Sequence, residues 1–292
     1  MPELPEVETT RRGLLPLVGK TVKSVTIRHP TLRWPIPHQL IQLLPNQKLQ
    51  SLTRRAKYIL CEFRGETFCD KTSCNEKNGG VLLLHLGMSG RICLLDANYP
   101  PEKHDHFDIE FKDGQVLRLR DPRRFGAVLW IENNGIDNKN YDHVLLNSLG
   151  PEPLEDGFNA KYLHKALSSK SVAIKNAIMD GHIVVGVGNI YAAESLFRAR
   201  IHPETPAKDL SLAKCERLVT EIKSTLNDAL KAGGSSLRDF FGTDGNPGYF
   251  QQEYFVYART DQPCKVCGKA IKCIRLGQRS TFYCESCQKR KI

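Results

Sequence analysis

Four cysteines near the C-terminus have the spacing of a metal site. Cys264 and Cys267 form one CxxC pair, Cys284 and Cys287 form a second, and sixteen residues separate the two pairs. Each pair can present two thiolates from a tight turn, and two such turns complete a tetrahedron around a metal. The spacing predicts a zinc ribbon with one structural Zn2+, because four thiolates leave no open position for catalysis. A redox pair is the alternative, although one CxxC would be enough for it; Cys273, between the pairs, is expected to be a bystander.

The first ten residues, MPELPEVETT, place Pro2 directly after the start methionine and Glu3 beside it. A small residue at position 2 is compatible with removal of Met1, which would leave a free secondary amine on Pro2. Such an amine can serve as a nucleophile, or it can be an ordinary product of processing. These residues by themselves leave both interpretations open.

The charge of the chain points to a polyanionic partner. The formal net charge is +10 and the pI is about 9.1. Residues 257–292 hold nine Lys or Arg against two acidic residues, although four zinc-bound thiolates would offset part of that excess. A basic surface most simply implies nucleic acid, while a solvated basic tail would have the same composition.

Length and composition indicate a globular protein. The 292 residues, 40% hydrophobic and 25% charged, are enough for two domains. No apolar run approaches the roughly 20 residues that span a bilayer, and the N-terminus lacks the pattern of a signal peptide. We therefore expect a cytoplasmic protein with reduced thiols. Cys61, Cys93 and Cys215 lie among apolar residues and are expected in the core, whereas Cys69 and Cys74 lie in a polar stretch predicted to be a surface loop.

Strand patterns dominate the first half of the chain. Eight segments alternate or run apolar, with Gly, Pro and Asn between them: 21–27, 48–52, 57–63, 81–86, 91–95, 107–111, 115–120 and 127–131. So many strands in this stretch imply a sandwich or a barrel. In the seventh segment Leu117 and Leu119 alternate with Arg118 and Arg120, which predicts one buried face and one basic face.

Helical spacing occurs at the start of the chain and in its second half. The residues after PELP predict a short helix with Pro5 in its first turn. Segments 171–181 and 211–234 predict two further helices that end at Gly181 and Gly233.

The segment VVGVGNIYAAESLF resembles a phosphate-binding turn. Gly186, Gly188 and Asn189 precede a helical pattern, and Asn189 is expected to cap the helix. Glycines before a helix leave backbone N–H groups that can hold an anion such as a DNA phosphate. Tyr191 replaces the third glycine of a dinucleotide-binding motif, and the P-loop lysine is missing, which argues against a nucleotide site. An ordinary helical turn is the alternative.

Together these pieces resemble the formamidopyrimidine-DNA glycosylase family. The matching motifs occur in the family's order across nearly the whole chain: PELPEVET, RRAKY, HLGMSG, PPEKHDH, DPRRFGA, VVGVGNIYAAESLF, DGNPGYF and the final zinc ribbon. The resemblance implies an α+β multidomain protein. Its expected parts are a catalytic β-sandwich domain with flanking helices over 1–135, a linker over 136–152, a helix–two-turn–helix DNA-binding domain over 153–237, a lesion-capping loop over 238–253 and a zinc finger hairpin over 254–292.

The resemblance also implies an activity. Family members remove oxidised purines, chiefly 8-oxoguanine and formamidopyrimidines, from double-stranded DNA and then nick the strand by β,δ-elimination, and we expect this chain to do so as a monomer. It implies that Pro2, freed by loss of Met1, attacks the sugar C1′ and forms a Schiff base, and that Glu3 moves protons at the sugar ring oxygen. Lys57 matches the proton donor for β-elimination and Arg279 the donor for δ-elimination.

DNA contacts follow from the same resemblance. His104, Arg123, Lys170 and Asn189 match the family's DNA contacts, and Met88, Arg123 and Phe125 match the residues that fill the space left by the extruded nucleotide. For Met88 and Phe125, core packing is the alternative. The chain departs from the family's pattern at 64–80, which is longer and more polar than usual, and at Ala258, where glycine is usual.

Three other functions remain possible on sequence grounds. An endonuclease VIII-like glycosylase shares the Pro2–Glu3 chemistry but prefers oxidised pyrimidines, and the segment TDGNPGYF argues against it. A non-catalytic zinc-ribbon protein that binds DNA would explain the charge and the cysteines but not Pro2, Glu3 or Lys57. A zinc-dependent hydrolase is disfavoured because the metal has no open position.

Overall fold

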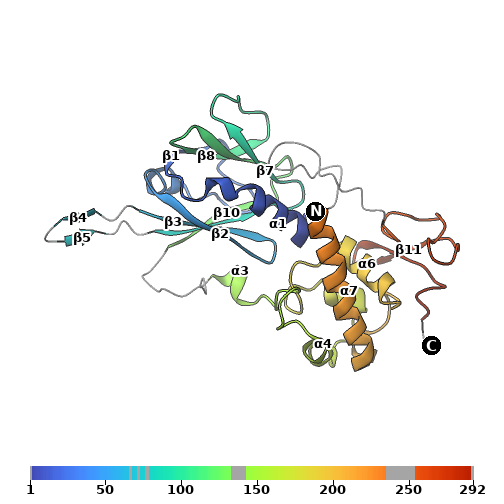
Figure 1. Cartoon of the computed structure of the whole chain (residues 1–292). Coiled ribbons are helices and arrows are strands. Elements are labelled where there is room, and N and C mark those ends of the chain that lie inside the picture. Colours follow the sequence, from blue (N-terminus) through green and yellow to red (C-terminus); the bar gives the residue numbers. More distant parts are fainter. Residues whose placement is uncertain are drawn as a thin grey trace. The chain divides into compact units, whose positions relative to one another are not determined.

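The computed structural model describes residues 2–65, 68–70, 73–75, 79–132, 143–234 and 254–290. The chain divides into two compact units, Met1–Leu146 with Gly233–Phe250 and Asn147–Ala232 with Gln251–Ile292 (Figure 1). The predicted lesion-capping loop at 238–253 and part of the predicted linker lie outside the described residues. Among the helices in the described ranges, none is long and apolar enough to cross a membrane.

The first unit contains two four-stranded antiparallel sheets. The first sheet has the order β1 (Val22–Ile27), β8 (Asp105–Phe111), β9 (Gln115–Arg120), β7 (Arg91–Asp96). The second has the order β10 (Ala127–Glu132), β6 (Gly80–His85), β3 (Tyr58–Arg64), β2 (Lys48–Arg55). All eight strands predicted from the sequence are confirmed.

One hydrophobic core joins the two sheets. Ile59 and Phe63 of β3 alternate toward the same buried cluster as Phe107 and Phe111 of β8, as the period of two requires. Val7 of helix α1 (Leu4–Gly13) packs into this cluster too, and Pro5 lies in the first turn of α1 as expected. Full burial of each such side chain contributes about 1.5–3 kcal/mol. The first unit is therefore a β-sandwich with flanking helices, completed by η1 (Leu15–Leu17) and α2 (Leu40–Leu43).

The second unit is helical, with a two-stranded hairpin near its end. Its elements are α4 (Ala160–Leu167), α5 (Ile174–Ile178), α6 (Asn189–Arg198), η2 (Ala207–Asp209), α7 (Leu212–Lys231), β11 (Lys272–Leu276) and β12 (Arg279–Tyr283), and α3 (Val144–Asn147) stands at the boundary of the units. Helix α7 ends as predicted, with Gly233 in the left-handed region just beyond it.

The helix predicted over 171–181 is shorter than expected. Helix α5 has five residues and is capped at Met179 rather than at Gly181. On its N-terminal side the backbone of Ala173 pairs in a β-bridge with Pro206, and the N–H of Ile174 donates to the carbonyl of Thr205. Because the backbone at this end of α5 is paired with another segment, the helix does not extend further toward its N-terminus.

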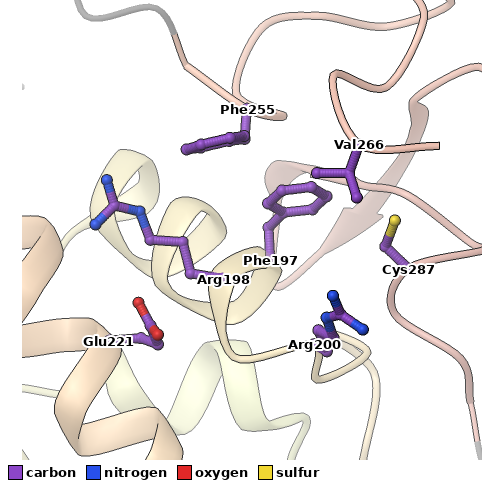
Figure 2. Close-up of a pocket in the computed structure, with 7 residues that line it drawn as sticks. All are labelled: Phe197, Arg198, Arg200, Glu221, Phe255, Val266 and Cys287. Atoms are coloured by element: carbon purple, nitrogen blue, oxygen red, sulfur yellow. The ribbon is translucent and has the colours of Figure 1, made fainter. Parts of the chain in front are cut away.

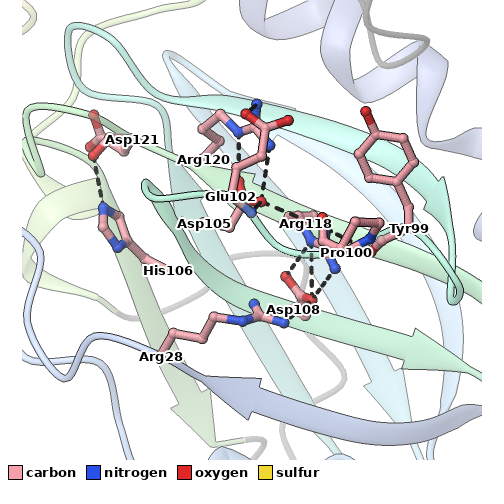
Figure 3. Close-up of polar contacts among 10 residues, drawn as sticks. All are labelled: Arg28, Tyr99, Pro100, Glu102, Asp105, His106, Asp108, Arg118, Arg120 and Asp121. Atoms are coloured by element: carbon pink, nitrogen blue, oxygen red, sulfur yellow. Dashed lines mark hydrogen bonds and ion pairs between the residues drawn. The ribbon is translucent and has the colours of Figure 1, made fainter.

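The basic face predicted for β9 is neutralised and partly buried. Arg118 is 3% exposed and lies directly opposite Asp108 of β8, with N–H groups donating to that carboxylate at 2.9 Å and to the carbonyls of Tyr99 and Pro100 (Figure 3). Arg120 lies opposite Asp105 and donates to it at 2.6 Å. The strand register therefore pairs each arginine with an acid, so this row does not form the free basic surface that the sequence suggested.

The polar stretch around Cys69 and Cys74 is also more regular than predicted. It contains two short strands, β4 (Phe68–Asp70) and β5 (Ser73–Asn75), which pair with each other in a separate antiparallel sheet. The expected surface loop is thus a hairpin inserted between β3 and β6.

We expect Arg118→Met to destabilise the first unit. The substitution removes the buried guanidinium from Asp108 and leaves that carboxylate only the partly exposed Arg28, at 2.7 Å. The loss should therefore approach, without exceeding, the roughly 3–5 kcal/mol of a fully broken buried pair. Lys23→Met is the matched control on the same sheet, because the Lys23–Glu110 pair spans 2.7 Å but Lys23 is 60% exposed; we expect it to cost at most about 1 kcal/mol. Urea unfolding of both variants measures the difference, and equal losses would contradict the role given to burial.

Candidate active site and zinc centre

One row of paired residues brings three loops to the same end of the second sheet. His85, the last residue of β6, pairs with Tyr58, the first of β3, on one side and with Ala127, the first of β10, on the other. The residues just beyond this row must lie near one another. They are Lys57 before β3, the loop 86–90 after β6 and the loop 121–126 before β10.

Lys57 stands in the turn between β2 and β3. Arg55 and Tyr58 form the closing pair, and Ala56 adopts a φ of +54° that L-residues rarely take. The turn is held from behind, since Arg54 donates from Nη1 to the carbonyl oxygen of Ala56 at 2.9 Å. Lys57 itself is half-buried.

The same arginine ties this turn to helix α1. Arg54 Nε lies 3.4 Å from the carboxylate of Glu8, which also receives hydrogen bonds from Arg11 and Arg12. Burial opposes the charge of Glu8, but these hydrogen bonds prevail and lower its pKa below the ordinary value. A charged Glu8 therefore connects the helix that follows Pro2 to the turn that carries Lys57.

Pro2 and Glu3 are buried at the start of α1, and Glu3 is 2% exposed. Glu3 is the N-cap of the helix, and its backbone N–H donates to the carboxylate of Glu6 at 2.8 Å in a reciprocal capping box. Glu6 thus complements the N-terminus of the helix. Gly234, with a φ of +90°, passes so close that a Cβ there would lie 3.5 Å from Glu6.

Asp121 organises the loops at this end of the sheet. Its fully buried carboxylate accepts from Ser89 Oγ at 2.7 Å and from the backbone N–H groups of Arg123 and Gly126 at 3.3 and 2.8 Å. Its backbone N–H donates to the carbonyl of His104 at 3.0 Å. One carboxylate therefore holds the loops that carry Met88, Arg123 and Phe125, and its backbone holds His104. Sequence reasoning missed Asp121, although it stands inside the quoted segment DPRRFGA.

Met88 and Phe125 lie on the surface. They are 39% and 45% exposed, so the core-packing alternative is wrong for both. The guanidinium of the exposed Arg123 lies 4.8 Å from the centre of the Phe125 ring. Two neighbouring loops therefore present two apolar side chains and one cationic side chain at the surface.

His85 is a further residue that the sequence analysis did not single out. Burial, and then the positive charges of Lys57 and Arg33, lower its pKa to about 4. Its Nδ1 accepts from the backbone N–H of Gly87 at 3.1 Å. At neutral pH it is therefore a neutral imidazole that holds the start of the Met88 loop.

In the second unit, Arg279 is presented by the hairpin β11–β12. Leu276 and Arg279 form its closing pair, and the two residues between them, Gly277 and Gln278, have φ values of +52° and +63°. Two positive φ values characterise the type I′ turn that matches strand twist. Arg279 is exposed directly after this turn, which confirms the predicted hairpin.

A buried lysine fastens this hairpin to helix α6. Lys175 is fully buried, and its Nζ donates to Asn189 Oδ1 at 2.6 Å, Thr281 Oγ1 at 2.6 Å and the carbonyl of Ser280 at 3.1 Å. Asn189 also donates to the Ser280 carbonyl. The expected N-cap role of Asn189 is wrong, since Gly188 is the N-cap and the Asn189 side chain serves Lys175 and Ser280.

Lys170, by contrast, is exposed in the turn after α4. Its backbone is fixed at both ends, because its N–H donates to Leu167 and its carbonyl accepts from Lys208. Lys175 was missed because a lysine among apolar helix residues gives no local indication of its partners, two of which lie more than a hundred residues away.

The four predicted zinc ligands come together. All four sulfur atoms lie within 4.8 Å of one another, with Cys264–Cys287 at 3.9 Å and Cys267–Cys284 at 3.4 Å. A tetrahedral ion with Zn–S bonds of about 2.3 Å requires sulfur separations of about 3.8 Å. The Val266 N–H donates to Cys264 Sγ, as an outer-shell group should. These residues therefore fit one structural zinc.

Four further cysteines lie where they were expected. Cys61, Cys93 and Cys215 are buried, and Cys273 is exposed outside the four-sulfur cluster. Core residues Ala193 and Phe197 of α6 pack against the finger.

A cavity of about 320 Å³ lies beside the zinc cluster rather than at the predicted catalytic residues (Figure 2). Phe197 and Phe255 stack at 5.3 Å on one side, and the Arg198 guanidinium lies 5.7 Å from the Phe255 ring. Cys287 also lines it. Arg200, Glu221 and Val266 complete the walls, which are thus aromatic with charges of both signs.

Three family models match the chain. The formamidopyrimidine-DNA glycosylase N-terminal domain matches residues 1–128, the formamidopyrimidine-DNA glycosylase H2TH domain matches 149–241, and the zinc finger found in FPG and IleRS matches 261–290. The formamidopyrimidine-DNA glycosylase of Methylobacillus flagellatus is 60% identical over 288 residues, which are 99% of this chain and 96% of that protein. The chain belongs to the formamidopyrimidine-DNA glycosylase family.

Solved structures of the family agree over the full length. Lactococcus lactis Fpg in complex with abasic-site DNA matches with a TM-score of 0.86 at 32% identity, over 99% of this chain and 100% of that one. MutM in complex with DNA containing carbocyclic 8-oxo-G matches with a TM-score of 0.85 at 34% identity and the same coverage. The family and the fold class inferred from the motifs are thus confirmed.

We expect Asp121→Ala to disorganise the two loops without unfolding the sandwich. The substitution removes an acceptor shared by one hydroxyl and two backbone N–H groups, and buried donors left unpaired cost about 1–3 kcal/mol each. Affinity for duplex DNA, measured by fluorescence anisotropy, should fall, with the strand core preserved in amide exchange. The control Asp121→Asn keeps one carbonyl acceptor and should lose less. Equal affinity of all three proteins would contradict the role of Asp121.

We expect removal of the metal to release the finger. Chelation, or Cys264→Ser, takes away ligands that also belong to the buried cluster of Val256 and Ile271, so amide protection across 254–290 should fall. The matched control is Cys273→Ser, which lies outside the cluster and should retain one zinc per chain by metal analysis. Loss of zinc in that control would show that the ligand set is misassigned.

Proposed function

We propose that this protein is a bifunctional DNA glycosylase and abasic-site lyase of base excision repair. It removes oxidised purines, 8-oxoguanine and formamidopyrimidines, from double-stranded DNA and cuts the abasic strand by β,δ-elimination. We propose further that it works as a monomer in the cytoplasm. Family membership and the damaged DNA in the relatives' structures support the reaction class.

The observation that carries the proposal is the link between Pro2 and Lys57. Helix α1 begins just after Pro2, its Glu8 meets Arg54, and Arg54 holds the turn that carries Lys57. A nucleophile and a proton donor that act in one reaction need fixed relative positions.

Pro2 acts as the nucleophile once Met1 is removed. An α-amine has a pKa near about 7.7–8.0 against about 10.4 for lysine, so roughly a tenth is unprotonated at neutral pH. The amine lone pair forms a bond to C1′ while the glycosidic bond breaks and its electrons leave with the base. The nitrogen then loses its proton to the Glu3 carboxylate, and its lone pair forms the C1′=N iminium as the bond between C1′ and the ring oxygen breaks. The freed ring oxygen takes that proton from Glu3.

The iminium then serves as an electron sink. Loss of a C2′ proton lets the 3′-phosphate leave in β-elimination, with Lys57 as the proton donor, and δ-elimination releases the 5′-phosphate. Arg279 matches the donor for this second step. A guanidinium rarely gives up its proton, so its main contribution is to hold a phosphate, and Lys175 steadies the neighbouring residue of the hairpin.

Recognition requires extrusion of the damaged nucleotide. Met88 and Phe125 wedge into the space it leaves, and Arg123 pairs with the orphaned base. His104 and Lys170 contact the DNA, and Asn189 contacts a phosphate. The exposure of Met88, Arg123 and Phe125 on adjoining loops supports these roles.

The test is borohydride trapping on a duplex with 8-oxoguanine opposite cytosine, followed by peptide mass mapping. We expect a covalent adduct on an N-terminal Pro2 that lacks Met1. An N-terminally extended chain is the matched control, because it keeps every residue but converts the amine into an amide, and it should give no adduct. An adduct formed only with oxidised pyrimidines would instead support the endonuclease VIII-like activity. Tight binding with intact zinc and no adduct would support the DNA-binding protein.

A further inference from the structure

The hairpin β4–β5 pairs two cysteines to which the proposed repair function gives no role. The strand register is Phe68 opposite Asn75, Cys69 opposite Cys74, and Asp70 opposite Ser73. The hairpin is a two-stranded sheet of its own within the long connection between β3 and β6 (Figure 1). Its cysteines are therefore brought together by backbone pairing and not by chance proximity.

The backbone geometry of this pair suits a disulfide. Residues directly opposite in an antiparallel pair have Cα atoms about 4.5 Å apart where they are not hydrogen-bonded and about 5.5 Å apart where they are. Disulfides join residues with Cα separations of about 4.4–6.8 Å. Either type of pair thus falls within range. Cys69–Cys74 is the middle one of the three residue pairs of the hairpin.

The other cysteines are committed or isolated. Four form the zinc cluster, and three are buried in the two units. Burial raises the pKa of Cys61 to about 12 and that of Cys215 to about 11, so these thiols are poor nucleophiles. Cys273 is exposed but is not part of the zinc cluster.

We propose that Cys69 and Cys74 are a reversible redox pair that closes a disulfide across the β4–β5 hairpin. The oxidant is a small-molecule disulfide such as oxidised glutathione. The thiolate of one cysteine attacks a sulfur of the oxidant and releases one thiol. The second cysteine attacks the resulting mixed disulfide and releases the other. The two cysteines lose two protons and two electrons, and the oxidant becomes two thiols.

The bond would change the order of the hairpin. An isolated two-stranded hairpin is at best marginally stable in water, and a cross-strand disulfide fixes its register. In a reducing cytoplasm the pair is held as a dithiol, so the bond forms when the ratio of oxidised to reduced small thiols rises.

The experiment exposes the full-length, zinc-loaded protein to graded ratios of oxidised and reduced glutathione. Acid quenching, alkylation of the free thiols and peptide mass mapping then show whether each cysteine is a free thiol, a mixed disulfide or part of a disulfide within the chain. We expect Cys69 and Cys74 to lose alkylation together and form a bond to each other, with full recovery after a dithiol reductant. Zinc content should stay at one per chain throughout, which separates this chemistry from oxidation of the finger.

Single variants provide the matched control. In Cys69→Ser and in Cys74→Ser, the remaining cysteine should stop as a glutathione mixed disulfide, as Cys273 should in every protein. The proposal would be overturned if wild-type Cys69 and Cys74 also stopped as mixed disulfides, stayed alkylated when Cys273 is modified, or bonded to other cysteines.

Discussion

The row Tyr58–His85–Ala127 determines where the loops of the first unit lie. The register between two paired strands can shift only by an even number of residues, because a shift by one residue would turn the buried face of a strand outward. The single core shared by the two sheets excludes such a slip. Lys57, Met88 and Phe125 therefore reach the same end of the sheet as a consequence of hydrophobic packing, although none of them belongs to the core.

Buried polar groups complete what strand pairing begins. Asp121 in the first unit joins two loops, and Lys175 in the second joins α5, α6 and the hairpin β11–β12. Glu194 accepts from the backbone N–H groups of three successive residues at the entrance to the finger, at 2.8–3.0 Å. A buried charge is costly unless its hydrogen-bonding capacity is filled. Each of these groups thus favours a single arrangement of the segments around it.

The net charge overstates the surface available to DNA. Arg118 and Arg120 are paired with acids across the strand register, and the buried Lys175 donates to Asn189, Ser280 and Thr281. Arg123 and Arg279, by contrast, are exposed directly beside turns. The net positive charge indicated the class of partner. The folded structure shows which basic side chains stabilise the protein and which are exposed and can contact a phosphate.

Local patterns in the sequence determined the features that depend on neighbours along the chain. The eight strands follow from alternation, the zinc site from two CxxC turns, and the Arg279 hairpin from a two-residue turn that tolerates positive φ. Asn189 and the length of α5 could not be predicted this way. The Asn189 side chain does not cap α6, because it hydrogen-bonds with Lys175 and Ser280. Helix α5 is short because the backbone at its start pairs with residues 205–206. Tertiary structure decided both points, because the partners of Asn189 and of the start of α5 are distant in sequence. The propensities of neighbouring residues therefore do not predict them.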